Sequence, residues 1–265
     1  MELIGAAYLI LKAERAQVHL DALNRELDLF LKEPYTITRK DDVQNGRHVR
    51  RTQLKPNDPV IAMLLGEFLY SLRSGLDQMA WQLSLAVARS DPKTRGNICF
   101  PIYENFSNPD TQKTYAKVRK YFPDAVAAEI DSLQPHNGSS SPQEHPLWQL
   151  NRLCNLDKHR LIPFHSRTMP IYFPNNPAAK VQHFEGEYAI EVSVPIKDKR
   201  QLDIEPDGTC LIEFGDWEVD WHIPRQRLSE IHDFIVNSVI PRFMQFKFSA
   251  LFENKLRIGD IKPSR

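Results

Sequence analysis

Two long stretches of the chain carry apolar residues at helical spacing, and this pattern constrains the fold more than any other feature. In residues 2–31 an apolar residue recurs at every third or fourth position, which forms one stripe along a helix: Leu9, Ala13, Ala16, Leu20, Leu23, Leu27 and Phe30. The second stretch starts at Asp58-Pro59, an N-cap residue followed by proline at the first helical position, and extends to about Arg89. Two amphipathic helices so close in sequence are expected to pack against each other in an antiparallel arrangement.

The rest of the chain mixes helical and strand-like patterns. Helices are expected over Tyr115–Leu133 and from Pro146 to about Arg160, and Pro224 begins a last helix that Pro241 kinks or breaks. Residues 170–222 hold short alternating runs that predict strands: Ile171–Phe173, Tyr188–Ile196, Leu202–Ile204, Cys210–Phe214 and Trp217–Ile223. Turn signals separate these runs, and Pro206-Asp207-Gly208 is a strong hairpin signal.

These patterns predict an α+β fold in two parts. Residues 1–165 are expected to form an N-terminal antiparallel helical bundle domain. Residues 166–265 are expected to form a small antiparallel β-sheet plus a C-terminal helix, packed on the bundle.

A basic segment lies between the two long helices. The formal net charge of the chain is zero, so any binding of nucleic acid needs a local basic patch rather than the field of the whole protein. Residues 35–57 hold such a set: Arg39, Lys40, Arg47, His48, Arg50, Arg51 and Lys55. The segment reads as irregular or strand-like, and its basic residues form either a solvated loop or a phosphate-contacting patch.

Several common classes of protein lack support in this sequence. Its ten glycines do not cluster and no G-x-S-x-G occurs, which argues against nucleotide-hydrolysing motors, Rossmann dehydrogenases and α/β-hydrolases. The three cysteines are scattered and predict neither a disulfide framework nor a zinc site. No histidine or acidic residue has a recognised metal-ligand spacing, so no metal or other cofactor is expected. No stretch approaches the roughly 20 apolar residues of a membrane span, and we expect a cytoplasmic protein without a membrane partner.

The first concentrated polar motif is Leu72-Arg73-Ser74-Gly75-Leu76-Asp77-Gln78. Arg73 and Asp77 are four residues apart, so they lie on the same side of their helix, at the margin of its apolar face. An arginine in that place must be paired because an unpaired buried charge is costly. Either the two side chains pair with each other, or Asp77 holds an arginine of another helix. Gly75 in mid-helix costs about 1 kcal/mol relative to alanine, which indicates the close approach of another backbone or a ligand.

The second motif runs from Asn151 to Arg160. Asn151, Asn155 and His159 recur at intervals of four and predict a polar row, while Asp157 and Arg160 are neighbours three residues apart. A basic last turn suits the helix dipole, so the segment is either a functional site or a structural cap with hydrogen bonds between helices. A histidine beside arginine and lysine also suits phosphodiester chemistry, because imidazole transfers protons near neutral pH and guanidinium binds phosphate.

Five short motifs occur in a fixed order: Arg15-Ala16-x-x-His19, Leu72-Arg73-Ser74-x-Leu76-Asp77-x-x-Ala80-Trp81, Phe100-Pro101-Ile102, Leu133-Gln134-Pro135 and Asn155-x-Asp157-Lys158-His159-Arg160. This set resembles an uncharacterised bacterial family that carries the same landmarks in the same order, over residues 1–165. The last motif is the most specific part of the resemblance, which brings no established activity.

More distantly, a helical bundle with an arginine and, five positions on, a histidine resembles the HEPN superfamily. That resemblance implies a homodimer and a metal-independent ribonuclease of defence or toxin–antitoxin systems, which cuts RNA with the RNA's own 2′-hydroxyl as nucleophile. Arg73 matches the arginine of the pattern, whereas the histidine position falls on Gln78, which cannot act as an acid or base. The chain is then a binding or inactive version, or His159 supplies the imidazole.

The leading hypothesis from the sequence is a HEPN-like protein that binds RNA or a nucleotide and, if it is an enzyme, is a metal-independent endoribonuclease. His159 would move protons, Arg73 would hold phosphate, and three side chains would orient them: Asp77, Asn155 and Asp157. Further phosphate contacts would come from Arg160, Lys158 and Arg152. The alternative is a non-catalytic dimeric scaffold or immunity-type protein whose polar motifs are buried ties between helices. In either case a protein partner could bind the C-terminal region.

Overall fold

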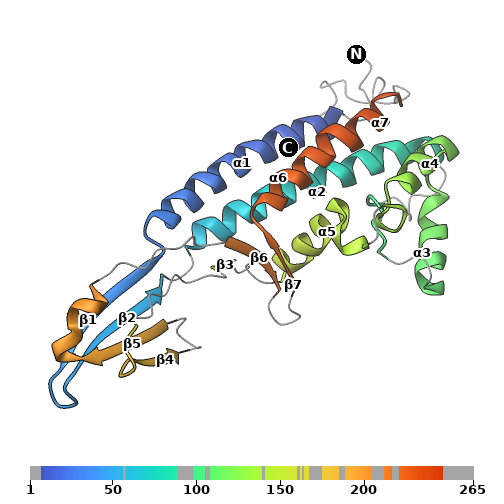
Figure 1. Cartoon of the computed structure of the whole chain (residues 1–265). Helices are drawn as coiled ribbons and strands as arrows, with labels where there is room; N and C mark the ends of the chain where they lie inside the picture. Colours follow the sequence, from blue (N-terminus) through green and yellow to red (C-terminus); the bar gives the residue numbers. More distant parts are fainter. Residues whose placement is uncertain are drawn as a thin grey trace, which may run out of the picture. The chain divides into compact units, whose positions relative to one another are not determined.

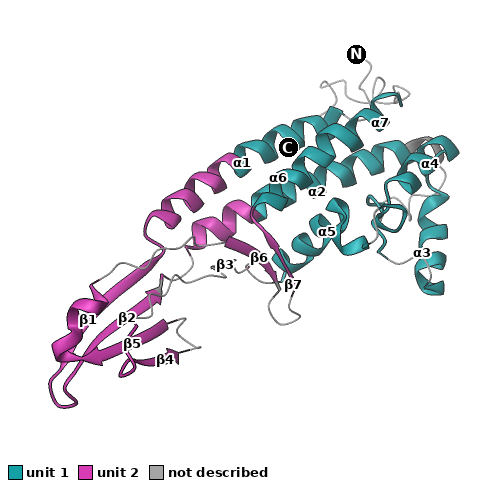
Figure 2. Cartoon of the chain, in the orientation of Figure 1, with its two compact units in different colours: residues 1–20, 66–160, 226–265 teal, residues 21–65, 161–225 magenta. Residues whose placement is uncertain are grey.

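The chain forms two compact units, each made of segments that are distant in sequence. The computed structural model describes residues 7–55, 58–88, 98–104, 108–138, 141–159, 162, 164–166, 175–184, 189–203, 212–216 and 221–246. Unit 1 comprises residues 1–20, 66–160 and 226–265, and unit 2 comprises residues 21–65 and 161–225 (Figure 2). Each unit contains residues from before and after residue 165. The domain division expected at that residue stays a prediction.

The described part of the chain has an α+β fold, as the sequence predicts, with seven α-helices and two antiparallel sheets (Figure 1). The HEPN-like arrangement of the bundle stays a prediction. Among the described residues, no helix combines the length and the apolar character needed to cross a membrane.

The two long helices are confirmed as α1 (Ala7–Lys32) and α2 (Pro59–Ala88). Six of the seven residues in the predicted stripe of α1 are buried, from Leu9 to Leu27, and Phe30 is half-buried. Within unit 1 the contacts between the two helices run in opposite order, since Lys12 lies near Gly75 and His19 contacts Glu67. The helices are therefore antiparallel in this unit, as their amphipathic patterns predict.

The remaining helices of unit 1 are α3 (Pro109–Arg119), α4 (Asp124–Ser132), α5 (Pro146–Asp157), α6 (Gln226–Phe234) and α7 (Ile240–Met244). The single helix expected over Tyr115–Leu133 is wrong. Pro123, which is extended at ψ 146°, separates α3 from α4 because proline cannot continue a hydrogen-bonded helix through its ring nitrogen. The expected interruption near Pro241 takes the form of a π-helical turn, Ile235–Val239, between α6 and α7.

Unit 2 contains a four-stranded antiparallel sheet in the order β1-β2-β5-β4. Its strands are β1 (Tyr35–Asp42), β2 (Arg47–Leu54), β4 (Lys180–Phe184) and β5 (Ala189–Pro195). The strand-like reading of residues 35–57 is confirmed over β1 and β2, which form a hairpin, whereas the phosphate-contacting role of its basic residues stays a prediction. The turn of this hairpin contains Gly46 at φ 61°, a conformation that glycine adopts without strain.

One face of this sheet is covered by the 3₁₀ helix Ile196–Leu202. Ile190, Val192 and Val194 of β5 pack with Leu202 into an apolar cluster beneath it. The strand expected at Leu202–Ile204 is wrong at Leu202, which ends this helix, and Ile204 lies outside the described residues.

A second antiparallel sheet has the order β3-β6-β7, with β3 (Phe164–Ser166), β6 (Ile212–Asp216) and β7 (Trp221–Pro224). The strands expected at Tyr188–Ile196, Cys210–Phe214 and Trp217–Ile223 overlap β5, β6 and β7 and are confirmed in those parts. The run Ile171–Phe173 and the turn at residues 206–208 lie outside the described residues. Strands β3 and β4 are additional to the prediction.

Gly75 provides a test of the contact between α1 and α2. A Cβ at this position would lie 2.8 Å from Lys12 Cβ and 2.9 Å from Leu9 Cδ1, which confirms the close approach that a mid-helix glycine indicated. We expect Gly75→Ala to lower the free energy of unfolding by about 1 kcal/mol, since the cost of overpacking exceeds the gain in helix propensity. Urea unfolding measures the change, with Gln78→Ala at an exposed position of α2 as control. A variant as stable as the wild type would contradict the close approach.

Candidate functional site

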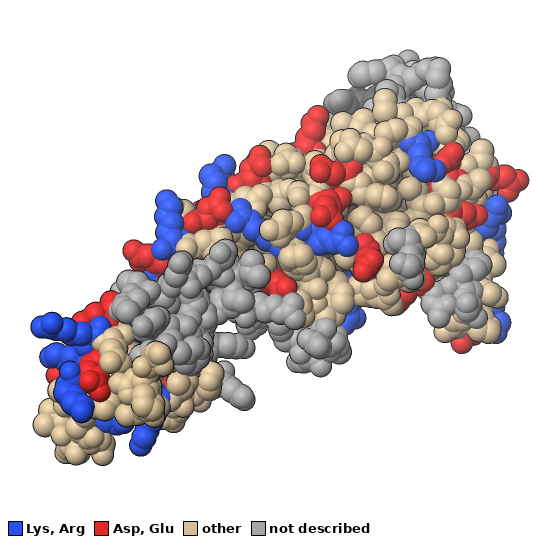
Figure 3. All heavy atoms as spheres, in the orientation of Figure 1, with Lys and Arg blue, Asp and Glu red and all other residues tan. Residues whose placement is uncertain are grey.

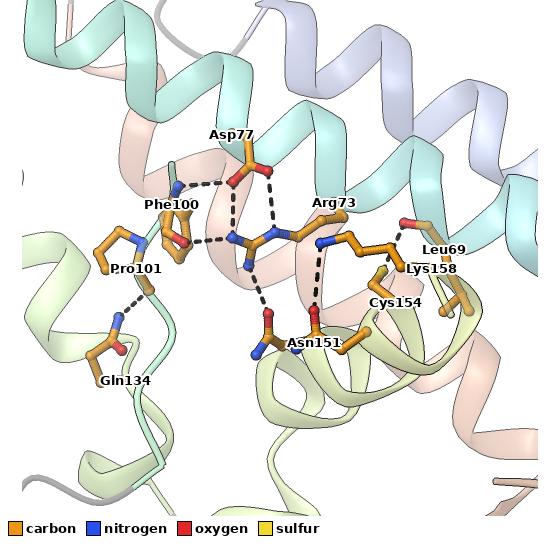
Figure 4. Close-up of polar contacts among 10 residues, drawn as sticks. Leu69, Arg73, Asp77, Phe100, Pro101, Gln134, Asn151, Cys154 and Lys158 are labelled. Atoms are coloured by element: carbon orange, nitrogen blue, oxygen red, sulfur yellow. Dashed lines mark hydrogen bonds and ion pairs between the residues drawn. The ribbon is translucent and has the colours of Figure 1, made fainter. Parts of the chain in front are cut away.

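Arg73 lies at the centre of a polar cluster in unit 1 that joins three separate segments of the chain (Figure 4). Its guanidinium contacts Asp77 one turn along α2, at 3.2 Å from Nε to Oδ2 and 3.0 Å from Nη2 to Oδ1. Nη1 donates to Asn151 Oδ1 of α5 at 3.3 Å, and Nη2 donates to the carbonyl of Phe100 at 3.0 Å. The side chain is only 14% exposed, so these bonds satisfy a charge that is largely removed from water.

Asp77 completes the cluster by accepting from the backbone. Its Oδ1 accepts from Phe100 N at 2.9 Å, so the carboxylate and guanidinium together hold both backbone polar groups of Phe100. Phe100 is itself fully buried and contacts the ring of Phe243 edge-on. The Arg73–Asp77 pair therefore fixes an extended segment, residues 98–104, against α2.

Gln134 holds the next residues of the same segment. Its Nε2 donates to Pro101 O at 2.9 Å and its Oε1 accepts from Tyr103 N at 3.0 Å, while the side chain is 1% exposed. Three of the sequence landmarks thus meet in space, since residues 72–77, 100–102 and 133–135 all contribute to this one arrangement. Sequence analysis missed Gln134 and the backbone of Phe100 as partners.

Helix α5 packs on α2 beside the cluster. His145 caps its N-terminus by accepting from Leu147 N at 3.2 Å, and burial lowers the pKa of this imidazole to about 4. Cys154 lies against α2, where its Sγ contacts Leu69 O at 3.6 Å, and burial raises the pKa of the thiol to about 12. That thiol is a packing group rather than a nucleophile, because a nucleophilic cysteine needs a lowered pKa.

The C-terminal end of α5 has a different character. Asp157 lies over Gly66 of α2, where its Oδ2 is 2.8 Å from the position of an added Cβ, and burial raises the pKa of this carboxyl. Asn155 is exposed and accepts from Lys158 Nζ at 3.5 Å, and Lys158 and His159 are also exposed. A partly buried acid at the negative end of a helix dipole is unfavourable, and here it lies two residues before an exposed imidazole.

The predicted polar row is only partly formed. Helix α5 ends at Asp157, so His159 falls in the following turn and does not continue the row of Asn151 and Asn155. The helix was expected to reach Arg160, and Arg160 itself lies outside the described residues. Arg152 is half-buried and has an interaction partner.

The two sequence motifs are thus distinct in their environment. Within the described residues, Arg73 contacts Asp77, Asn151 and Phe100, and His159 is not among its partners. No group of three or more histidine, cysteine or acidic side chains in the described ranges is arranged to hold a metal ion.

A third polar arrangement joins α1 and α2 within unit 1. Arg15 Nε donates to His19 Nε2 at 3.0 Å, and His19 Nδ1 lies 2.9 Å from Glu67 Oε2. The motif Arg15-Ala16-x-x-His19 carried this signal, because arginine and histidine four residues apart share one helix face. It explains that landmark as a tie between the two helices.

No protein-family model, curated protein sequence or solved structure matches the chain. The resemblances described from the sequence therefore stay predictions.

The bonds of the Arg73 cluster lead us to expect that Arg73 and Asp77 are strongly coupled in their effect on the free energy of unfolding. We expect Arg73→Ala to lower the free energy of unfolding by about 2–3 kcal/mol, because Asp77 and the Phe100 carbonyl lose a charged partner. Asp77→Asn should cost about 1–2 kcal/mol, and the double variant should cost less than the sum of the two. Urea unfolding measures the cycle, with exposed Lys158→Ala as control. Additive losses would show that the two side chains do not act as one unit.

The burial of Asp157 should make the free energy of unfolding depend on pH. Burial raises the pKa of the folded carboxyl above its ordinary value of 3.8, so the unfolded chain ionises first and stability falls as the pH rises through this window. Asp157→Asn removes this cost and should raise the urea midpoint at pH 7, and the difference should shrink below about pH 4. Asp203→Asn, at an exposed position, should show no such pattern. A lower midpoint for Asp157→Asn at pH 7 would contradict the assignment.

Proposed function

We propose that this chain is a non-catalytic interaction protein, of the scaffold or immunity type, in which the Arg73 motif ties helices together. The observation that carries the proposal is the use of the guanidinium. Of its five N–H groups, the one on Nε, one on Nη1 and both on Nη2 are engaged with Asp77, Asn151 and Phe100. A phosphate bound in two places would have to break these bonds and leave Asp77 without its cation.

Exposed apolar side chains in unit 1 support a role in binding another protein. Tyr8, Leu11 and Val18 of α1 are 43%, 61% and 59% exposed, and Tyr70 of α2 is 67% exposed. Where such side chains form a contiguous patch, they are typical of surfaces that bind a partner. A second copy of the chain would give the expected homodimer.

The second candidate is an RNA- or nucleotide-binding protein with metal-independent ribonuclease activity. The observation that favours it is the exposed end of α5, where Asn155, Lys158 and His159 all reach solvent. In this candidate His159 moves the proton of the 2′-hydroxyl, Lys158 and Arg160 hold phosphate, and Asp157 orients the imidazole. Arg73 and Asp77 then act at a distance, by holding α5 on α2.

Incubation of the purified chain with total RNA, with and without chelator, decides between the two candidates. For the interaction protein we expect no cleavage above the buffer control, and the same result for His159→Ala and Arg73→Lys. Gel electrophoresis of the RNA gives the readout. Cleavage that persists with chelator and is lost at least 100-fold in His159→Ala would overturn the non-catalytic proposal and establish the ribonuclease.

A further inference from the structure

In the described part of unit 2, the four-stranded sheet has one face beneath the 3₁₀ helix and an opposite face with exposed side chains, here called the open face. The register of the strands assigns each residue to a face. Directly paired residues of an antiparallel sheet point to the same side, and neighbours along a strand alternate. Arg39, His48 and Arg50 lie on the covered side with Val192 and Val194, beneath the 3₁₀ helix. Arg39 and Arg50 both donate to the carbonyl of Leu202 there, each at 3.4 Å.

The opposite face is mostly polar and basic, although Val49 and Ala189 on it are apolar and buried. Three rows of paired residues cross all four strands of this open face: Thr36–Gln53–Ala189–Phe184, Thr38–Arg51–Glu191–Gln182 and Lys40–Val49–Ser193–Lys180, followed by the shorter row Asp42–Arg47–Pro195. Thr36, Thr38, Lys40, Lys180 and Gln182 are exposed. Figure 3 shows basic side chains, with acidic ones among them, around this sheet and its 3₁₀ helix at the lower left.

The charges on the open face leave an excess of cations. Four basic residues, Lys40, Arg47, Arg51 and Lys180, share the face with two acids, Asp42 and Glu191. Arg51 pairs with Glu191 at 3.0 Å. Among the described residues the partners of Arg47 are neutral oxygens, at 2.9 Å to Ser193 Oγ, 2.6 Å to Ser193 O and 2.8 Å to Ala178 O. The charge of Arg47 is therefore positioned but not neutralised by these bonds.

At one edge of the open face an arginine lies over an aromatic ring in a cation–π contact. The guanidinium carbon of Arg51 lies 4.8 Å from the ring centroid of Phe184, which is half-buried on the edge strand β4. Unpaired bases stack on aromatic rings and on arginine planes, and hydroxyl and amide side chains bond the edges of bases and the 2′-hydroxyl. The threonines and glutamines of the open face supply such groups.

We propose that the open face of the β1-β2-β5-β4 sheet binds single-stranded RNA. Its cations contact phosphates, and the Arg51–Phe184 pair and the neighbouring amides contact bases. An A-form RNA duplex hides its base faces and has a deep, narrow major groove, so stacking and contacts to base edges at this surface favour an unpaired strand. This RNA-binding face lies in unit 2 and adds a partner to the proposed function. It does not depend on whether the Arg73 motif of unit 1 is a structural tie.

Fluorescence anisotropy with a labelled 20-nucleotide single-stranded RNA tests the proposal, using the full chain at low salt. We expect Lys40→Glu/Lys180→Glu to weaken binding at least tenfold. The matched control is Lys197→Glu/Lys199→Glu, which makes the same change of net charge at exposed positions of the 3₁₀ helix on the covered side and should change binding less than threefold. Equal weakening by the two pairs would overturn the assignment to the open face.

Further measurements distinguish specific binding of RNA from a general attraction of the protein to polyanions. Phe184→Ala should weaken binding at least fivefold, the lower end for stacking of one base, with circular dichroism confirming the fold. The slope of log K against log salt should be about −2 to −3, as expected for three to four phosphate contacts on a single strand. Absence of binding by the wild type at low salt, displacement of the RNA by polyglutamate, or equal affinity for duplex RNA or single-stranded DNA would each overturn the proposal.

Discussion

The hydrogen bonds of the Arg73 guanidinium are the interaction on which the arrangement of unit 1 depends. They bring together α2, the segment of residues 98–104 and α5 at one point, where the buried ring of Phe100 and the side chains of Gln134 and Cys154 add further contacts. A guanidinium suits this task because its donors point in fixed directions within one plane, so three acceptors from three segments are held in a defined relation. Loss of any acceptor leaves a largely buried cation under-bonded, which makes the cluster cooperative.

Because Arg73 is committed to these bonds, any chemistry at this place would have to use other residues. The end of α5 differs from the cluster in every relevant respect: Asn155, Lys158 and His159 are exposed, and Asp157 carries a raised pKa without a hydrogen bond or ion pair in the described part of the chain. Perturbed titratable groups next to exposed ones are typical of functional positions, whereas the saturated pair in α2 is typical of a structural tie. The two motifs therefore differ in their environment, and the Arg73–Asp77 pair has the bonds that a structural tie requires.

A contact between two side chains can be predicted from the sequence, whereas a contact to a backbone group cannot. The Arg73–Asp77 pair was predictable because both ends are side chains one helical turn apart. The bonds to Phe100 were not, since its backbone N–H and C=O carry no signature in a sequence. The β1–β2 hairpin was obscured because its covered face carries Arg39, His48 and Arg50, and Arg50 is only 1% exposed. Such residues bury their stems and disguise the alternation that identifies a strand.

Helix α2 owes its central position to two glycines. Gly66 and Gly75 are nine residues apart, which at 100° per residue places them about 180° apart around the helix. One side receives Leu9 and Lys12 of α1, and the other receives the carboxylate of Asp157. A side chain at either glycine would push a neighbour away, so α2 can be approached closely from two directions only because both positions lack a Cβ. The carboxylate of Asp157 is partly desolvated as a consequence, and the packing that orders the bundle thereby also perturbs the acid beside His159.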